Sequence, residues 1–114
     1  MSPVLYIVTA TLPDEPCASE YVDWLESGHL REVVALGKAR WGRIARVLEP
    51  AAPIRVESHY LFESRADFDT YVRMHANRLR AEGLQRFPVD RGLSFERRVC
   101  EIRGSVAAPG FRVD

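Results

Sequence analysis

Cysteine is scarce in this 114-residue chain, and so are lysine, net charge and long apolar runs. The two cysteines, Cys17 and Cys100, lie far apart and form no CxxC pair, which argues against a zinc knuckle or a redox pair. Both are interpreted as packing residues, although Cys17 lies near an expected helix N-terminus, where the pKa of a thiol can fall. Formal charge balances to zero, so no global field attracts nucleic acid or an acidic membrane.

No stretch approaches the roughly 18 consecutive apolar residues that a membrane-spanning helix needs. The first residues also lack a basic segment followed by an apolar run, so no leader peptide is indicated. These absences predict a cytoplasmic protein with no membrane partner. Lys38 is the only lysine, so the positive charge is carried almost entirely by arginine, which suits bidentate ion pairs but equally reflects genome composition.

What the chain does contain is a regular alternation of short apolar runs and helical patterns. Apolar residues recur at two-residue or three-and-four-residue spacing between turn signals rich in proline and glycine. We expect strands over residues 4–10, 40–48, 54–63 and 93–102, and helices over 17–37 and from Ser64, as N-cap, to about Gly83. The predicted domain covers residues 1–102, and residues 103–114 form a C-terminal tail that is either loose or draped on a neighbour.

This order is strand, helix, strand, strand, helix, strand, and its two halves resemble each other. A shift of fifty residues brings Val4 onto Ile54, Tyr21 onto Tyr71, and the pair Leu25 and His29 onto His75 and Leu79. The order predicts an α+β, ferredoxin-like βαββαβ fold, in which a four-stranded antiparallel sheet carries two helices on one face.

The other face of such a sheet is bare, yet the run Val4–Ala10 has almost no polar side. A large exposed apolar face is uncommon on a monomer, and Trp41 adds to this one. We therefore expect a homodimer that forms through the open sheet face.

Two motifs carry a resemblance to a known group of proteins. Trp24-Leu25 followed by Gly28-His29-Leu30, and the stretch His75–Leu84 leading to Phe87, resemble an uncharacterised bacterial domain-of-unknown-function family of the dimeric α/β-barrel superfamily. The resemblance covers residues 4–102. Relatives in that superfamily include monooxygenases and muconolactone isomerases, and they hold small aromatic or hydrophobic ligands between helices and sheet. Because their chemistry differs widely, the resemblance implies a fold and a pocket but no reaction.

Two inward-facing histidines, His29 and His75, are the candidate catalytic residues. Both lie on apolar helix stripes that face the same layer, where imidazole can transfer protons near neutral pH and phenols can donate to a developing oxyanion. This pattern is consistent with proton transfer or cofactor-free oxygenase-type chemistry on a small aromatic molecule. The candidate ligand-binding residues in the same layer are Tyr21, Tyr60, Tyr71, Leu25 and Phe68.

Simpler interpretations remain open. Each histidine can be a core or rim residue bonded to backbone or a carboxylate, and the whole chain can be a non-catalytic ligand-binding or protein-interaction module. His59 alternates onto the opposite sheet face, where a hydrogen bond between subunits is expected. Three dispersed histidines without HExxH predict no metal site. No cofactor is expected; a haem ligand at His75 stays open as an alternative, although no sequence feature demands it. The strand 54–63 lacks the basic, glycine-containing motif of RNA-recognition domains, so we expect no nucleic-acid partner.

Overall fold

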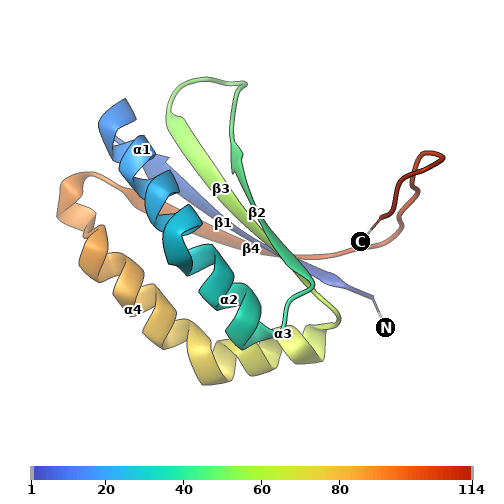
Figure 1. Cartoon of the computed structure of the whole chain (residues 1–114). Helices are drawn as coiled ribbons and strands as arrows, with labels where there is room; N and C mark the ends of the chain where they lie inside the picture. Colours follow the sequence, from blue (N-terminus) through green and yellow to red (C-terminus); the bar gives the residue numbers. More distant parts are fainter. Residues whose placement is uncertain (1, 114) are drawn as a thin grey trace.

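A computed structural model describes residues 2–113 of the chain as one sheet covered by helices on one side (Figure 1). The antiparallel sheet has the strand order β2-β3-β1-β4. Each helical segment is interrupted by a short π-helical turn. The elements are β1 Val4–Leu12, α1 Glu15–Trp24, the π turn η1 Leu25–His29, α2 Leu30–Gly37, β2 Trp41–Arg46, β3 Ile54–Phe62, α3 Arg65–Tyr71, the π turn η2 Val72–Ala76, α4 Asn77–Arg86, the 3₁₀ turn η3 Val89–Arg91 and β4 Ser94–Glu101. The order and sheet topology confirm the predicted ferredoxin-like βαββαβ fold.

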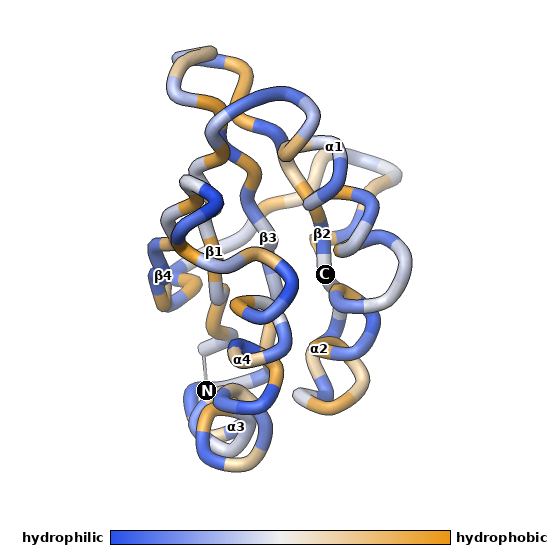
Figure 2. Tube along the Cα trace, turned by 90° about the vertical axis from the view of Figure 1, so that its left-hand side faces the viewer, coloured by the Kyte–Doolittle hydropathy of each residue, from blue (hydrophilic) through white to orange (hydrophobic). Residues whose placement is uncertain are grey.

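The two central strands place large apolar side chains under the helices. In β1, Val4, Tyr6, Ala10 and Leu12 are buried on this face, and β3 contributes a matching set at alternate positions. Figure 2 views the molecule from the helix side, with the helices in front of β1 and β3. Burying such side chains stabilises the fold by about 25 cal/mol per Å² of apolar surface, so this layer is the main source of stability.

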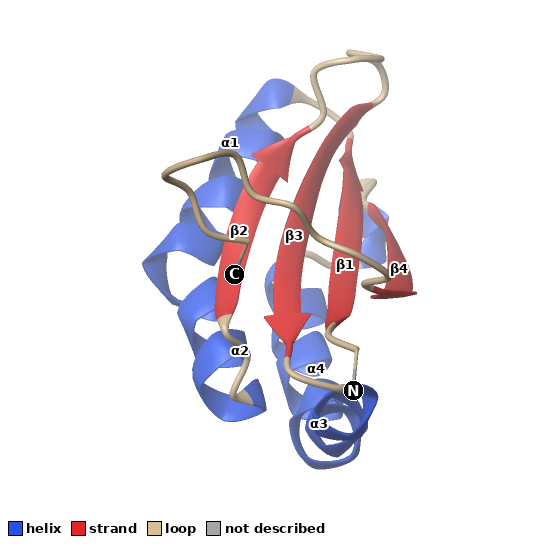
Figure 3. Cartoon of the chain, turned by 90° about the vertical axis from the view of Figure 1, so that its right-hand side faces the viewer, coloured by secondary structure: helices blue, strands red, loops and turns tan. Residues whose placement is uncertain are grey.

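The opposite face of the sheet carries no helix (Figure 3). Ile7 and Leu61 lie on it and are nonetheless nearly buried within the single chain. His59 also lies on this face, as the alternation predicts, and its Nε2 lies 2.8 Å from Oε1 of Glu57. The imidazole therefore has a partner within its own chain, and the expected bond between subunits stays a prediction.

Several element boundaries differ from the sequence prediction. The first helix begins at Glu15 rather than Cys17, because Asp14 caps it by accepting a hydrogen bond from the Cys17 amide at 2.9 Å. The strand β1 runs two residues beyond Ala10, and β2 is shorter than the expected 40–48. Ser64 is the N-cap of α3, as predicted, and accepts from the Asp67 amide at 3.2 Å.

The prediction that the second helix ends near Gly83 is wrong, because α4 continues to Arg86. A Cβ at Gly83 would lie 3.3 Å from Cη2 of Trp24, so glycine is placed there by the close approach of that indole. Phe87, which is fully buried, then closes the core just beyond the helix. Packing against Trp24 and Phe87 thus outweighs the weak helix propensity of glycine.

Past β4 the described chain forms no further helix or strand. Residues 103–113 extend away from the body and pass in front of the open sheet face (Figures 1 and 3). Val106 and Phe111 are 97% and 76% exposed, and Gly110 turns the chain with a φ of 87°. Within residues 2–113, no helix is both long enough and apolar enough to cross a membrane.

Candidate functional site

A small cavity lies between the helix layer and the sheet. Aromatic side chains dominate its wall, together with aliphatic residues, one histidine, one serine and two arginines. The lining residues are Tyr6, Val8, Tyr21, Trp24, Leu25, His29, Val33, Ser58, Tyr60, Tyr71, Leu79, Arg80, Gly83, Leu84, Phe95 and Arg97. The lining residues come from the strands β1, β3 and β4 and from the helical elements α1, η1, α2, α3 and α4, so most of the described fold contributes to one site.

The cavity is narrow, with a volume of about 50 Å³. A water molecule in the liquid takes up roughly 30 Å³, and a benzene-binding cavity measures about 150 Å³. A second hollow of about 260 Å³ lies on the surface next to it. Trp24 and His29 line both spaces, and their rings stack with centroids 4.1 Å apart at 19°. This stacked pair therefore lies where the cavity and the surface hollow are closest to each other.

His29 owes its position to the π turn η1, which it ends. Burial lowers the pKa of His29 to about 4, and the Glu82 carboxylate opposes this shift. The imidazole is therefore neutral at pH 7, and can both donate and accept a hydrogen bond. A group with so low a pKa is a weak base, because proton transfer is most efficient when the pKa lies near the working pH.

Three tyrosines from different elements face the cavity with Tyr6. Burial raises the pKa of Tyr21 to about 12, against the opposing effect of the Ser58 hydroxyl, and burial also raises the pKa values of Tyr60 and Tyr71. All three phenols are therefore protonated at neutral pH. Such phenols can donate hydrogen bonds to an acceptor in the cavity without themselves carrying charge.

Two polar atoms at the cavity wall lack a hydrogen-bond partner among the described residues. Ser58 is 1% exposed, and its hydroxyl is close enough to Tyr21 and Tyr60 to act on the pKa of both, yet its Oγ makes no contact that meets the geometric criteria for a hydrogen bond. The Nη2 of Arg80 donates to the Tyr6 hydroxyl at 3.2 Å, while the buried Nε of the same side chain has no partner. An unsatisfied buried polar group costs about 1–3 kcal/mol, so both atoms favour an additional bonding partner in this space.

The predicted site residues divide into two groups. His29, Tyr21, Tyr60, Tyr71 and Leu25 come together around the cavity. Phe68 instead packs in the core against Tyr6 and Phe62, with ring centroids 5.0 and 5.4 Å away.

The second candidate histidine, His75, is half-buried in η2 and is not among the residues that line the cavity. The structure therefore brings His29, but not His75, to the predicted ligand layer.

Sequence reasoning did not identify Trp24, Ser58, Arg80 or Arg97 as site residues. Ser58 carried a usable signal, since it is a hydroxyl at the centre of the apolar face of β3. The two arginines carried no signal, because arginine is abundant throughout this chain and usually lies on the surface.

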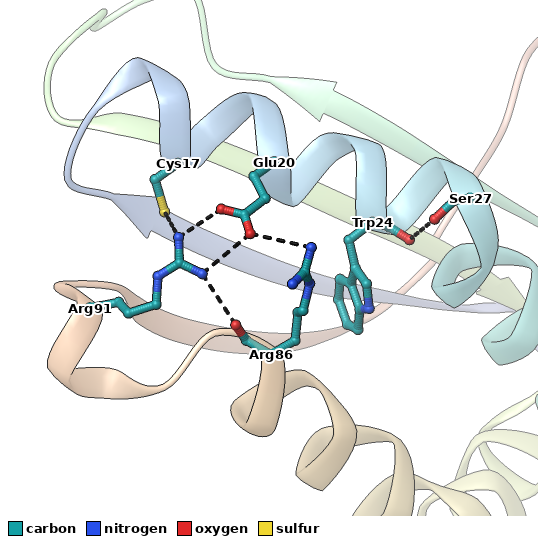
Figure 4. A network of polar contacts seen from close by, with 6 residues as sticks. All are labelled: Cys17, Glu20, Trp24, Ser27, Arg86 and Arg91. Atoms are coloured by element: carbon teal, nitrogen blue, oxygen red, sulfur yellow. Dashed lines mark hydrogen bonds and ion pairs between the residues drawn. The ribbon is translucent and has the colours of Figure 1, made fainter.

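A polar network outside the cavity fixes the far end of the helix layer (Figure 4). The Glu20 carboxylate accepts from Arg91 at 2.7 Å and lies 3.3 Å from a guanidinium nitrogen of Arg86, so it ties α1 to α4 and η3. Arg91 also reaches Cys17 Sγ at 4.0 Å. Burial nevertheless raises the pKa of the Cys17 thiol, which opposes the reactivity that its place near a helix N-terminus suggested. The contacts of Glu20 thus link α1 to α4 and to η3.

The described residues contain no group of three or more histidine, cysteine or acidic side chains placed to hold a metal ion. Cys17 and Cys100 are both free thiols.

Solved structures with the same fold include two from bacterial or environmental sources. A dimeric ferredoxin-like protein from an uncultured marine organism has 17% sequence identity and a TM-score of 0.72, over 93% of this chain and all of that one. A candidate monooxygenase from Shewanella loihica PV-4 has 16% identity and a TM-score of 0.57, over 92% of this chain and 99% of that one. At such low identity, both similarities show the fold alone.

No protein of curated function matches the sequence. A family model does, and it spans residues 3–102, which is the whole of the sheet and its helices. The chain therefore belongs to the family described as a domain of unknown function, DUF4286.

Proposed function

We propose that this chain binds a small, flat aromatic molecule in the cavity between the helices and the sheet. The observation that carries the proposal is the combination of aromatic walls with two unpartnered polar atoms, Ser58 Oγ and Arg80 Nε. Ligand sites are typically apolar spaces in which a few polar groups fix the orientation of the ligand. Here the rings provide the apolar surface, and the serine and arginine provide the orienting groups.

Binding requires the cavity to enlarge, and the stacked Trp24–His29 pair is the natural place for it to do so. Its displacement joins the cavity to the surface hollow of about 260 Å³, which is large enough for one aromatic ring. Gly28 lies in the same π turn as His29, and a Cβ there would meet no atom within 4 Å beyond its chain neighbours and the helix backbone, so this side of the turn is open. Two-state movement of a π turn is in keeping with the frequent occurrence of such turns at functional sites.

A thermal-shift series with phenol, indole and catechol tests this proposal. We expect at least one probe to raise the unfolding temperature of the wild-type chain, and Ser58→Ala to reduce the shift. Met74→Ala, which changes a side chain that is 63% exposed, is the matched control. Absence of any shift with all three probes, together with unchanged amide spectra at Gly83, contradicts the proposal.

Binding and catalysis place different demands on the histidines. The low pKa of His29 suits a neutral hydrogen-bonding group better than a strong base, so proton transfer or cofactor-free oxygenase-type chemistry is the finer and more demanding proposal. The alternative is a non-catalytic ligand-binding or interaction module. Repeating the probe series on His29→Ala and His75→Ala separates the residues: unchanged binding by His75→Ala removes that histidine from the site. Turnover of a bound probe that depends on His29 identifies an enzyme.

We also propose that two copies of the chain associate through the open sheet face. The supporting observation is that the tail that passes in front of that face carries the exposed apolar side chains Val106 and Phe111. The similar protein from a marine organism is described as dimeric. Apolar side chains held in the open by an extended tail are costly unless a partner covers them.

Sedimentation velocity at micromolar concentration tests the dimer. We expect the sedimentation coefficient of a dimer for the full chain, and a shift toward monomer for Phe111→Ser. Leu48→Ser, which alters a 77% exposed apolar side chain between β2 and β3, is the matched control. A folded monomer at this concentration contradicts the proposed dimer.

A further inference from the structure

The charge around the cavity is one-sided. Two guanidinium groups line it, Arg80 from α4 and Arg97 from β4, and the lining residues include neither aspartate nor glutamate. The register pairs Arg97 with Val8 of β1, which also lines the cavity, so Arg97 lies on the helix-covered side of the edge strand. The two cations therefore approach the same space from opposite layers.

Neither arginine forms an ion pair with any described residue, although eight of the other arginines do. Two acids that act on cavity residues, Glu82 on His29 and Glu32 on Tyr71, line the outer hollow instead. Both of them lie against Arg78, at 4.0 and 2.9 Å. Their charge is thus partly neutralised outside the cavity, and the positive charge of Arg80 and Arg97 is left without a counterpart.

The other polar groups of the wall do not supply negative charge. Tyr21 and Tyr71 stay protonated because burial raises their pKa values, even though Arg97 acts in the opposite direction on both and Arg80 does so on Tyr71. His29 is neutral. Two cations beside neutral phenols and a buried hydroxyl form a wall that is complementary to an anion with several acceptor oxygens.

We propose that the ligand of this site is an aromatic carboxylate, with its carboxylate held between Arg80 and Arg97 and its ring against Trp24 and the tyrosines. This inference rests on the proposed function and specifies the ligand class. The free Nε of Arg80 and its Nη groups can form the two parallel hydrogen bonds that a carboxylate accepts from arginine. Neutral aromatic molecules lack this interaction, so charge provides the selectivity of the site.

Titration of the ¹⁵N-labelled full chain with benzoate and with benzamide tests the inference, because the two probes share the ring and differ in charge. The signals followed are the Trp24 indole N–H and the Gly83 amide. We expect benzoate to bind about ten-fold more tightly than benzamide, since a charge-assisted bond exceeds a neutral one by about 1.4 kcal/mol. The preference should weaken as salt increases.

Arg97→Gln and Arg80→Gln should each reduce the preference for benzoate, while Arg97→Lys retains part of it. The matched control is Arg73→Gln, because Arg73 is exposed on η2 and forms no ion pair with a described residue. Arg97 is exposed on an edge strand, so its variant keeps the test decisive even if Arg80→Gln does not fold.

The outcomes separate the two proposals. Equal binding of benzoate and benzamide overturns the carboxylate inference and leaves the aromatic site standing. A benzoate preference that survives in both glutamine variants also overturns it. Failure of both probes to move either signal overturns the proposed function itself.

Discussion

The helical segment 15–37 and the helical segment 65–86 begin in the same way and meet the cavity differently. Their N-caps, Asp14 and Ser64, are fifty residues apart, and each accepts a hydrogen bond from the third residue that follows it. The strands before them, Val4–Leu12 and Ile54–Phe62, have the same length, and each ends two residues before the N-cap of the helix that follows. Tyr21 and Tyr71 are both buried and both line the cavity. Up to this point the two halves follow the shift of fifty residues.

The correspondence fails at one position and returns four residues later. Leu25 lines the cavity but His75, its counterpart, is not among the lining residues, whereas His29 and Leu79 both line it. The π turns explain the difference, because they begin at Leu25 in one segment and three residues earlier, by the same shift, in the other. A π turn adds about one residue to the helical repeat, which rotates the following side chains by roughly 100°.

Leu25 is the first residue of its π turn, so it precedes the added residue. His75 is the fourth residue of its π turn, so its side chain is already rotated. Beyond both turns the segments are in phase again, so His29 and Leu79 occupy equivalent places. The positions of the two π turns therefore account for why His29, and not His75, lines the cavity.

The largest effect that tests this comparison is expected at the out-of-phase pair. Leu25 is 1% exposed, so Leu25→Ala should lower the free energy of unfolding by about 2–5 kcal/mol. His75 is half-buried, and His75→Ala should cost only about 1 kcal/mol. Urea unfolding at pH 7.5 measures both. Equal losses in the two variants would show that His75 is as deeply packed as Leu25, and the phase argument would then be wrong.

The second effect comes from the charge of His29. Its pKa is lowered from 6.5 to about 4 in the folded chain, so between these values the unfolded chain binds a proton that the folded chain does not. Stability from the neutral ring is present above pH 6.5 and is lost as the pH falls toward 4. Between pH 7 and pH 5 the loss should be about 1–2 kcal/mol, allowing for solvent around a half-buried ring.

His29→Leu makes the first segment resemble the second at this position and removes the titrating group. We expect the variant to lose less stability than the wild type between pH 7 and pH 5, as measured by urea unfolding at each pH. Far-UV circular dichroism at pH 7.5 verifies that both proteins are folded. The same slope in both would mean that another group governs this pH window.

The sequence was sufficient to predict the architecture because strand alternation, helix stripes and turn residues all agree with one topology. The cap at Ser64 is one example that the structure bears out, and the fifty-residue offset between the two strands and between the two N-caps is another. The ends of helices and strands were less predictable where side-chain packing outweighs the local helix or strand propensity. The sequence predicts that the helix ends at Gly83, but the Trp24 indole packs close to this glycine and the helix continues to Arg86.

For the candidate site, the sequence predicted only that it lies in the layer between the helices and the sheet. The two-residue alternation of β3 placed Tyr60 on the helix-covered face, and the helical spacing of the first turns of α1 and α3 placed Tyr21 and Tyr71 there, and all three line the cavity. The periodicity did not anticipate the π turns, which depend on tertiary contacts and carry no composition of their own. That Arg80 and Arg97 line the same cavity from two layers also lies beyond local sequence patterns, since it depends on how β4 aligns with β1.

The smallest effect compares the glycines of the two segments. Gly28 has helical backbone and open space around it, so Gly28→Ala should raise the free energy of unfolding by about 0.5–1 kcal/mol. Gly83→Ala gains the same helical preference, but its Cβ would lie 3.3 Å from Cη2 of Trp24 and must push the indole aside. Its net gain should therefore be smaller, by urea unfolding at pH 7.5. An equal gain at both sites would mean that Trp24 moves without cost, which would itself support the idea that the stacked Trp24–His29 pair is the movable wall of the cavity.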